Sequence, residues 1–316
     1  MDVPKRLDIL RDRAAQFEKA RRFFSDRNVV EVDCPSLTTG APIDLHIDLF
    51  KVTDATHLSR YLHSSPEYCM KRLLAEGMGD IYQLGHVFRM GEVGRRHNPE
   101  FTMAEWYRVG FTFPQMMEET AEFVKLFLGQ LPVEMITYRE AIQKYARIDY
   151  ITASDEELLK LLRTNQVVLY EGIEQEGRDA ILNLILAELV EPHLGKGVIT
   201  LLAYYPPSQA ALARVVTLGG IEVSERFEVY VEGVELANGY HELTDPIEQR
   251  GRFEKANQER IIAGKTALPV DEFFLDGLKK GIPDCCGVAV GVDRLMMLRH
   301  KVKAISCVVP FDWSCC

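Results

Sequence analysis

The residues whose types and spacing best suit catalysis or binding lie in one short stretch, residues 88–107, with the sequence FRMGEVGRRHNPEFTMAEWY. The guanidinium of Arg89 can form paired hydrogen bonds to a carboxylate or a phosphate. Glycines at positions 91 and 94 permit a tight turn through which backbone can approach a nucleotide. The ring of Phe101 offers a surface on which adenine can stack. The stretch therefore predicts a site that binds ATP together with an amino acid.

Glu105 and Tyr107 lie two residues apart in the same stretch. On a β-strand this spacing places both side chains on one side, so the carboxylate and the phenol can share a pocket. The alternative interpretation is an amphipathic hairpin with a solvated basic turn. The net charge of the chain is −10, with which a local basic face such as Arg89, Arg95, Arg96 and Arg108 can coexist.

Glu67 follows Ser65 and Pro66 at the start of a predicted helix. Proline is favoured in the first turn of a helix, and a carboxylate there complements the helix dipole. This stabilising role is the alternative to a role for Glu67 in binding a substrate.

Residues 226–239, RFEVYVEGVELANG, alternate between apolar and polar positions around Glu232-Gly233, which predicts a hairpin. Glu228 and Glu235 lie seven residues apart across the turn, so antiparallel pairing can bring them to one place. Two close carboxylates repel unless a cation joins them, and such oxygens near a triphosphate suit Mg²⁺. The alternative is a salt bridge to a nearby arginine.

Residues 287–298, GVAVGVDRLMML, predict a strand followed by a helix. The small residues let backbone approach a ring, and Arg294 at the start of the helix can reach the terminal phosphate of a nucleotide. A tightly packed core strand explains the glycines almost as well, but it does not explain the position of Arg294.

The remainder of the chain supplies the elements that must position these residues. Apolar periodicity and capping signals predict helices over residues 6–27 and 178–189, a helix after the capping box Ser154–Glu157, and strands over residues 29–32 and 81–89. A helical insertion over about residues 114–223 carries little chemistry. No internal repeat or linker is found, so one α+β catalytic domain over residues 1–316 is predicted.

Composition restricts the class of protein. Charged residues make up 27% of the 316 positions and hydrophobic residues 47%, which is typical of a soluble globular protein. No apolar run approaches the ~20 residues of a membrane helix, and the first residues carry charges where a secretory signal would be apolar. A cytoplasmic protein is therefore predicted. The acidic total weighs against tRNA as the main partner, and the seven cysteines lack the spacing of a zinc site.

Three segments, occurring in order, resemble motifs 1, 2 and 3 of class II aminoacyl-tRNA synthetases: residues 6–35, 88–107 and 287–298. HNPEFT at 97–102 and SSPEYCMKRLL at 64–74 are similar to the lysyl branch, and especially to the lysyl-tRNA synthetase paralogs that attach (R)-β-lysine to elongation factor P. The resemblance implies a catalytic domain with a central antiparallel sheet flanked by helices and without an anticodon-binding domain. It also implies a homodimer, in which motif 1 would bury Phe17, Phe24 and Val32 against the partner.

The resemblance implies a role for each candidate residue. For the amino-acid substrate these residues are Ser65, Pro66, Glu67, Glu105, Tyr107, Asn238 and Glu242. For ATP they are Arg89, Met90, Gly91, Glu92, His97, Phe101, Glu235, Leu236, Gly291 and Arg294, of which Arg89 and Arg294 are catalytic. For Mg²⁺ they are Glu228 and Glu235. Glu67 would receive the amino group near the carboxylate, whereas Glu105, Tyr107 and Glu242 would receive the distal ammonium.

Two positions depart from the lysyl-tRNA synthetase pattern. Met90-Gly91 replaces Asn-Glu, whose glutamate contacts adenine, and Glu92 stands one residue further on. Ala289 replaces a glycine, as in the β-lysine ligases. The implied function is ATP-dependent formation of a (β-)lysyl-adenylate and transfer of its acyl group to a lysine of elongation factor P. The alternatives are an anticodon-independent tRNA aminoacylase and a non-catalytic lysine or nucleotide sensor.

Overall fold

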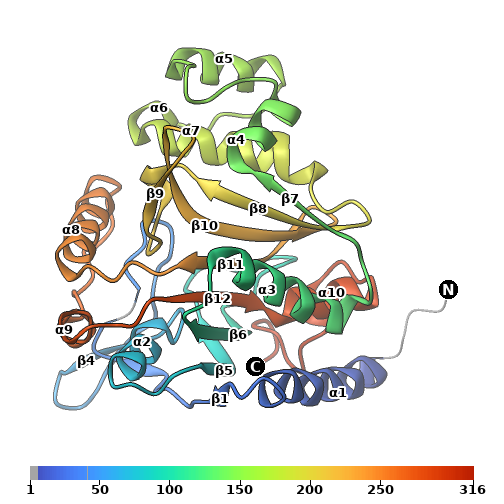
Figure 1. The fold of residues 1–316 in the computed structure, drawn as a ribbon, viewed down its shortest axis with the longest axis vertical. Coiled ribbons are helices and arrows are strands. Elements are labelled where there is room, and N and C mark those ends of the chain that lie inside the picture. The colour runs from blue at the N-terminus through green and yellow to red at the C-terminus, as the bar shows by residue number, and fades with distance from the viewer. Residues whose placement is uncertain (1–5, 41) are drawn as a thin grey trace. The chain divides into compact units, whose positions relative to one another are not determined.

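The structure, a computed structural model, describes residues 6–40 and 42–316 (Figure 1). The first five residues, which belong to the segment predicted not to be a secretory signal, lie outside this described part. The chain divides into two units, residues 1–129 with 242–316 and residues 130–241, which we call unit 1 and unit 2. Within the described residues, no helix has the length and apolar character needed to cross a membrane.

The central strand of the main sheet in unit 1 is β6 (Glu100–Val109). It pairs antiparallel with β5 (Ile81–Phe88) and with β12 (Cys285–Gly291), and β5 pairs in parallel with the short β1 (Val30–Glu31). Residues 102–108 of β6 are buried without alternation, as expected for a strand covered on both faces. A second, antiparallel sheet contains β2 (Leu37–Thr38), β3 (Lys51–Thr53) and β4 (Ser59–Leu62).

The helices of unit 1 are α1 (Arg6–Ser25), α2 (Glu67–Ala75), α3 (Phe113–Leu128), α8 (Pro246–Ile262), α9 (Glu272–Lys280), α10 (Val292–His300) and the 3₁₀ turn η5 (Ile305–Cys307). Phe24 of α1 stacks on Tyr82 at 4.1 Å between ring centroids and meets Trp106 edge-on at 5.2 Å. Phe24 and Val32 are both buried within their own chain. The argument that these two side chains need a second subunit to bury them is therefore wrong.

In unit 2 the central strand is β10 (Ile221–Val231). It pairs antiparallel with β11 (Val234–His241), β8 (Ile199–Tyr205) and β9 (Val215–Leu218), and β8 pairs in parallel with β7 (Val133–Thr137). The predicted hairpin is confirmed, since β10 and β11 join through Glu232 and Gly233, which both have positive φ angles. The α+β class is confirmed, and the largely antiparallel pairing is interrupted by the parallel pairs β1–β5 and β7–β8.

Most helical structure of unit 2 lies between β7 and β8. It consists of α4 (Tyr138–Ala141), the π turn η1 (Ile142–Ala146), α5 (Asp155–Thr164), α6 (Ile173–Glu176), α7 (Arg178–Ile185), the π turn η2 (Leu186–Val190) and η3 (Glu191–His193), while η4 (Pro207–Gln209) follows β8. The predicted capping box is confirmed, because Ser154 and Glu157 each accept a backbone N–H from the other. The helix predicted to reach residue 189 changes to π geometry after Ile185.

Candidate active site

Three glutamates of unit 1 converge in the interior. Glu67 is the first residue of α2, Glu105 lies in the middle of β6, and Glu242 is held where its N–H donates to the carbonyl of Cys285 at 3.0 Å. All three side chains are buried. Burial of a carboxylate is unfavourable unless hydrogen bonds or cations offset the lost hydration.

Hydrogen bonds hold Glu105 on both oxygens. Oε2 accepts the hydroxyl of Ser65 at 2.7 Å, and Oε1 accepts the hydroxyl of Tyr107 at 2.8 Å. Burial and the charge of Glu67 nevertheless raise the pKa of Glu105 to about 8. The structure thus brings together Ser65, Glu67, Glu105, Tyr107 and Glu242, all of which the sequence predicted for substrate binding.

Lys71 is a member of this cluster that the sequence reasoning missed. Its Nζ lies 2.6 Å from Glu67 Oε1 and 2.6 Å from Glu242 Oε2, and its side chain is 1% exposed. Burial alone would lower the pKa of Lys71, but the charges of Glu242 and Glu67 outweigh it and hold that pKa well above its usual value. The i,i+4 spacing of Glu67 and Lys71 on a predicted helix was the signal that could have identified this pair.

Gly287 of β12 closes one side of this cluster. A Cβ atom added there would lie 2.4 Å from both Glu242 Oε1 and Tyr107 Cε1. Only a residue without a side chain fits beside the ring of Tyr107, which is the tightly packed core strand considered as the alternative for this glycine.

Gly287→Ala is expected to destabilise the fold by about 1–3 kcal/mol, because the added methyl must displace Tyr107 and Glu242. Urea unfolding measures the loss. The control is Gly251→Ala in α8, where a Cβ would meet nothing within 4 Å and helix propensity favours alanine. Equal stability of the two variants would contradict the assigned packing.

Arg89 lies immediately after β5, beside Phe101 and Glu92, the two residues considered for adenine recognition. Its guanidinium sits 5.2 Å from the ring centroid of Phe101, and Nη1 is 3.8 Å from Glu92 Oε1. Gly91 has φ +81°, a conformation that side chains disfavour. Restoring the family's glutamate at this position would therefore strain the turn.

His97 and Arg294, predicted to contact the outer phosphates, lie together in unit 1. Arg294 Nη2 donates to His97 Nε2 at 2.7 Å. Partial burial and the neighbouring Arg294 charge lower the pKa of His97, which keeps the imidazole neutral and able to accept this bond. Gly291 ends β12 directly before α10, the helix that carries Arg294.

Asp293 anchors the start of α10. Its Oδ1 accepts Arg13 Nη1 at 2.5 Å, and its Oδ2 accepts the N–H of Thr102 at 2.7 Å. Arg13 also donates to the hydroxyl of Thr102 at 2.7 Å. These buried bonds join α1, β6 and α10, the elements that resemble motifs 1, 2 and 3.

In unit 2, both oxygens of Glu228 already accept hydrogen bonds. Oε1 accepts from Arg226 at 2.6 Å, and Oε2 accepts the hydroxyls of Tyr205 and Tyr230 at 2.6 Å and 2.5 Å. The salt bridge considered as the alternative for Glu228 is therefore present. Oε2 uses both of its lone pairs, but Oε1 keeps one, so this finding does not remove Glu228 as a metal ligand.

The remaining residues predicted in unit 2 lie on β11. Its register places Glu235 opposite Tyr230 and Asn238 opposite Glu228, with an irregularity after Val229. Glu228 and Glu235 are thus not direct cross-strand partners, although the charges of both, after burial, raise the pKa of Tyr230. Asn238 accepts from Arg226 at 3.2 Å and donates to Tyr240 at 2.8 Å, and Leu236 is buried.

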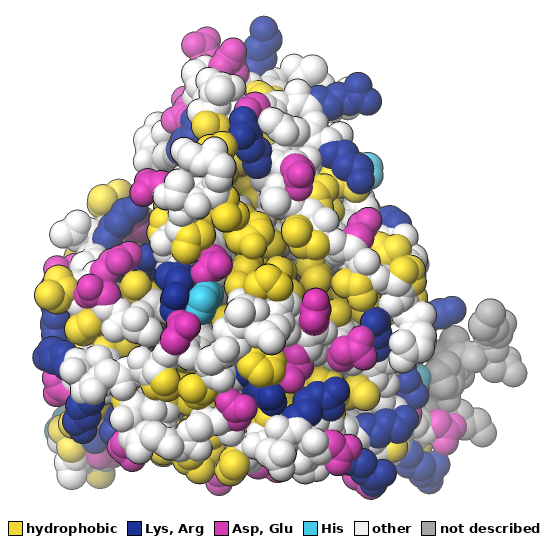
Figure 2. Space-filling view, viewed as in Figure 1, with side chains coloured by type: hydrophobic (Ala, Val, Ile, Leu, Met, Phe, Trp, Pro, Cys, Tyr) yellow, Lys and Arg dark blue, Asp and Glu magenta, His cyan; other side chains and the backbone are white. Residues whose placement is uncertain are grey.

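Of the four arginines considered for a basic face, Arg108 does not lie on the surface. Arg108 is buried, with Nε 3.3 Å from Asp80 Oδ2 and Nη1 3.5 Å from Glu119 Oε2. Its assignment to that face is wrong, because a strand buried on both sides points it inward, while Arg95 and Arg96 are exposed. On the face seen in Figure 2, positive and negative side chains are interspersed.

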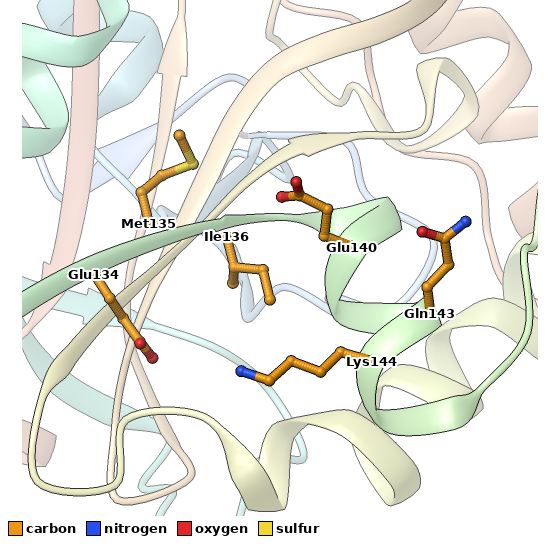
Figure 3. Close-up of a pocket in the computed structure, with 6 residues that line it drawn as sticks. All are labelled: Glu134, Met135, Ile136, Glu140, Gln143 and Lys144. Atoms are coloured by element: carbon orange, nitrogen blue, oxygen red, sulfur yellow. The ribbon is translucent and has the colours of Figure 1, made fainter.

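A separate open cavity of about 550 Å³ lies within unit 2. Figure 3 shows its lining residues, which are Glu134, Met135, Ile136, Glu140, Gln143 and Lys144. None of them was predicted to bind substrate, ATP or metal. This cavity is therefore distinct from the predicted site.

Comparison with known proteins agrees with this geometry. The family of class II tRNA synthetases (D, K and N) matches residues 2–313, so the chain belongs to that family. Within the family, it is 42% identical over 304 residues to an elongation factor P–(R)-β-lysine ligase of Salmonella arizonae, covering 95% of this chain and 93% of the relative. Proteins of the same description from Salmonella gallinarum and Salmonella paratyphi B are 42% and 41% identical over the same shares.

Proposed function

We propose that this protein is an ATP-dependent ligase that activates (R)-β-lysine and transfers it to a lysine of elongation factor P. The observation that carries the substrate class is the buried cluster of Glu67, Glu105 and Glu242, which suits an amino acid with two ammonium groups. The relatives' description supports the isomer and the acceptor. Family membership supports the use of ATP.

The reaction has two steps and needs no protein nucleophile. A carboxylate oxygen of the amino acid attacks the α-phosphorus of ATP, and pyrophosphate leaves as the adenylate forms. The acceptor ε-amine then attacks the acyl carbon, AMP leaves with the electron pair of the broken C–O bond, and the new amide nitrogen loses a proton. Arg89 and Arg294 would act by positioning and by neutralising phosphate charge.

Mg²⁺ would be held by Glu228 and Glu235. Their carboxylate oxygens are the donors that this cation prefers, and it would neutralise charge on the triphosphate when bound. The described residues contain no group of three or more His, Cys, Asp and Glu side chains suited to a metal. The remaining ligands would therefore come from phosphate and water.

One experiment separates this proposal from its alternatives. The protein is incubated with ATP and radiolabelled lysine or (R)-β-lysine, together with either elongation factor P or total tRNA. Label on elongation factor P supports the proposal, and label on tRNA supports aminoacylation. No adenylate with either amino acid would point to a sensor.

Binding of the diamino acid is expected to depend on pH through Glu105. Because the pKa of Glu105 is raised to about 8, this carboxyl carries a proton at neutral pH and gains its charge as the pH rises. The KM for the diamino acid should fall by up to about tenfold per pH unit between pH 6 and 8 and level off above. Steady-state kinetics check this, and a KM that rises with pH would contradict it.

A homodimeric state is also proposed, on the family resemblance alone. Such a dimer would be symmetric. Sedimentation equilibrium at micromolar concentration should give twice the chain mass of 36.0 kDa. An active species of single-chain mass would refute the dimer.

A further inference from the structure

The position expected for a substrate ammonium contains an ammonium of the protein itself. Lys71 Nζ lies 2.6 Å from Glu67 and 2.6 Å from Glu242, the two carboxylates assigned to the two amino groups of the substrate. The side chain leaves α2 one turn after Glu67 and is 1% exposed. Lys71 could therefore either compete with a substrate ammonium or hold the carboxylates in position for it.

The surroundings of Lys71 indicate a fixed position. Its Nζ lies 5.9 Å from the ring centroid of Tyr107 and 5.8 Å from that of Phe274, at distances suited to cation–π attraction. Both rings are buried, and α9, which carries Phe274, packs against α2. Moving the ammonium away would leave two buried carboxylates without this cation.

The charge of the cluster follows from its members. Glu67, Glu105 and Glu242 carry three negative charges when ionised, and Lys71 reduces the total to two. A lysine or β-lysine carries two ammonium groups, which match that total. Besides Glu67, Lys71, Glu105 and Glu242 themselves, the titratable groups that interact with this cluster include Tyr68 of α2, Tyr107 of β6 and the thiol of Cys34, which in turn contacts Cys69 of α2.

We propose that Lys71 is a tethered counter-ion that sets the charge of this pocket to match an amino acid with two ammonium groups. This role of Lys71 rests on the proposed function, since it requires that the acidic cluster binds the diamino acid. Lys71 touches no reacting atom and is therefore a positioning residue. It holds Glu67 and Glu242 in place and favours ionisation of Glu105, which then takes the substrate cation.

The first test compares Lys71→Met, which keeps the length but removes the charge, with Lys71→Arg, which keeps the charge. In Lys71→Met, Glu105 loses the nearby charge that lowers its pKa and holds its proton more tightly. The fall of KM for the diamino acid should therefore move to higher pH by about one unit or more, with KM near pH 7.5 raised on the order of tenfold. Lys71→Arg should keep the pH at which KM falls.

Chemical rescue is the second test, because a merely structural role would not produce it. Lys71→Ala removes three carbons and the ammonium, so n-propylammonium supplies the missing atoms. The amine should restore pyrophosphate exchange saturably and return the fall of KM to the wild-type pH, whereas n-propanol should not. The matched control is Lys279→Ala in α9, whose ion pair with Asp276 is exposed and whose activity should equal wild type.

Several outcomes would overturn the inference. An unshifted pH profile in Lys71→Met would show that Lys71 does not set the charge, and a lowered KM would show that it competes with substrate. If Lys71→Met does not fold, the double variant Lys71→Met/Glu67→Gln removes one charge of each sign and should fold. Failure of that variant as well would assign Lys71 to packing. Absence of exchange in the wild type would instead reject the proposed function.

Discussion

Replacing either Glu105 or Glu242 with glutamine is expected to lower lysine-dependent pyrophosphate exchange about a hundredfold or more. Above pH 8, where Glu105 is ionised, each substitution removes one negative charge facing a substrate ammonium, and both carboxylates are buried, with 1–3% exposed. Leaving a buried cation without its partner costs on the order of 3 kcal/mol, which corresponds to this factor. Exchange rates with saturating ATP measure the effect.

The matched control is Glu122→Gln in α3, whose carboxylate is 52% exposed in its pair with Lys125. Solvent screens this pair, so its loss should leave exchange unchanged. Wild-type rates in both pocket variants would disprove the assignment of the acidic cluster to the substrate.

Asp293→Asn is expected to cause the largest loss of stability, about 3–5 kcal/mol, because it leaves the buried guanidinium of Arg13 without a counter-charge. Urea unfolding at constant m-value measures the change in free energy. The double variant Arg13→Met/Asp293→Asn should recover most of the loss, since it removes both charges. The control Asp8→Asn breaks an exposed pair with Arg11 and should change stability by less than about 1 kcal/mol.

A result in which Asp293→Asn is as stable as Asp8→Asn would contradict the anchoring role. The anchor should also affect catalysis, because Arg294 follows Asp293 directly in α10. A folded Asp293→Asn protein should therefore bind ATP more weakly, which calorimetry can measure.

Local signals in the sequence predicted much of the fold. Ser154 and Glu157 form the predicted capping box, and Glu232-Gly233 forms the predicted hairpin turn, because both depend on residues close in the chain. The resemblance to synthetase motifs placed Glu67, Glu105 and Glu242 in one substrate site, and the structure brings them together.

Two errors concern the direction of a side chain within the fold. Arg108 was assigned to a basic face, and Phe24 to a subunit interface, yet both are buried within the chain. Strand and helix periodicity say which residues share a face, but not what covers it. Glu228 and Glu235 are also not direct partners, because the two-residue turn pairs Glu235 with Tyr230, and the irregularity after Val229 then places Glu228 opposite Asn238.

Lys71 was overlooked for the opposite reason. A lysine four residues after a glutamate on a helix ordinarily forms a solvated surface pair. Only the three-dimensional structure, in which α2 meets β6 and the segment at Glu242, reveals that this pair is interior. Burial turns a weak surface interaction into one that determines the charge of a pocket.

The bonds that Arg13 makes to Asp293 and Thr102 also bear on how this protein is synthesised. Arg13 and Asp293 are separated by 280 positions, and unit 1 is interrupted by all of unit 2. On the ribosome, α1 is synthesised first, but Arg13 can pair with Asp293 only after the last part of the chain has been synthesised. Unit 2 is continuous in sequence and can therefore fold earlier. Long-range closure of this kind slows folding. The start of α10, and with it Arg294, is therefore anchored only after almost the whole polypeptide has been synthesised.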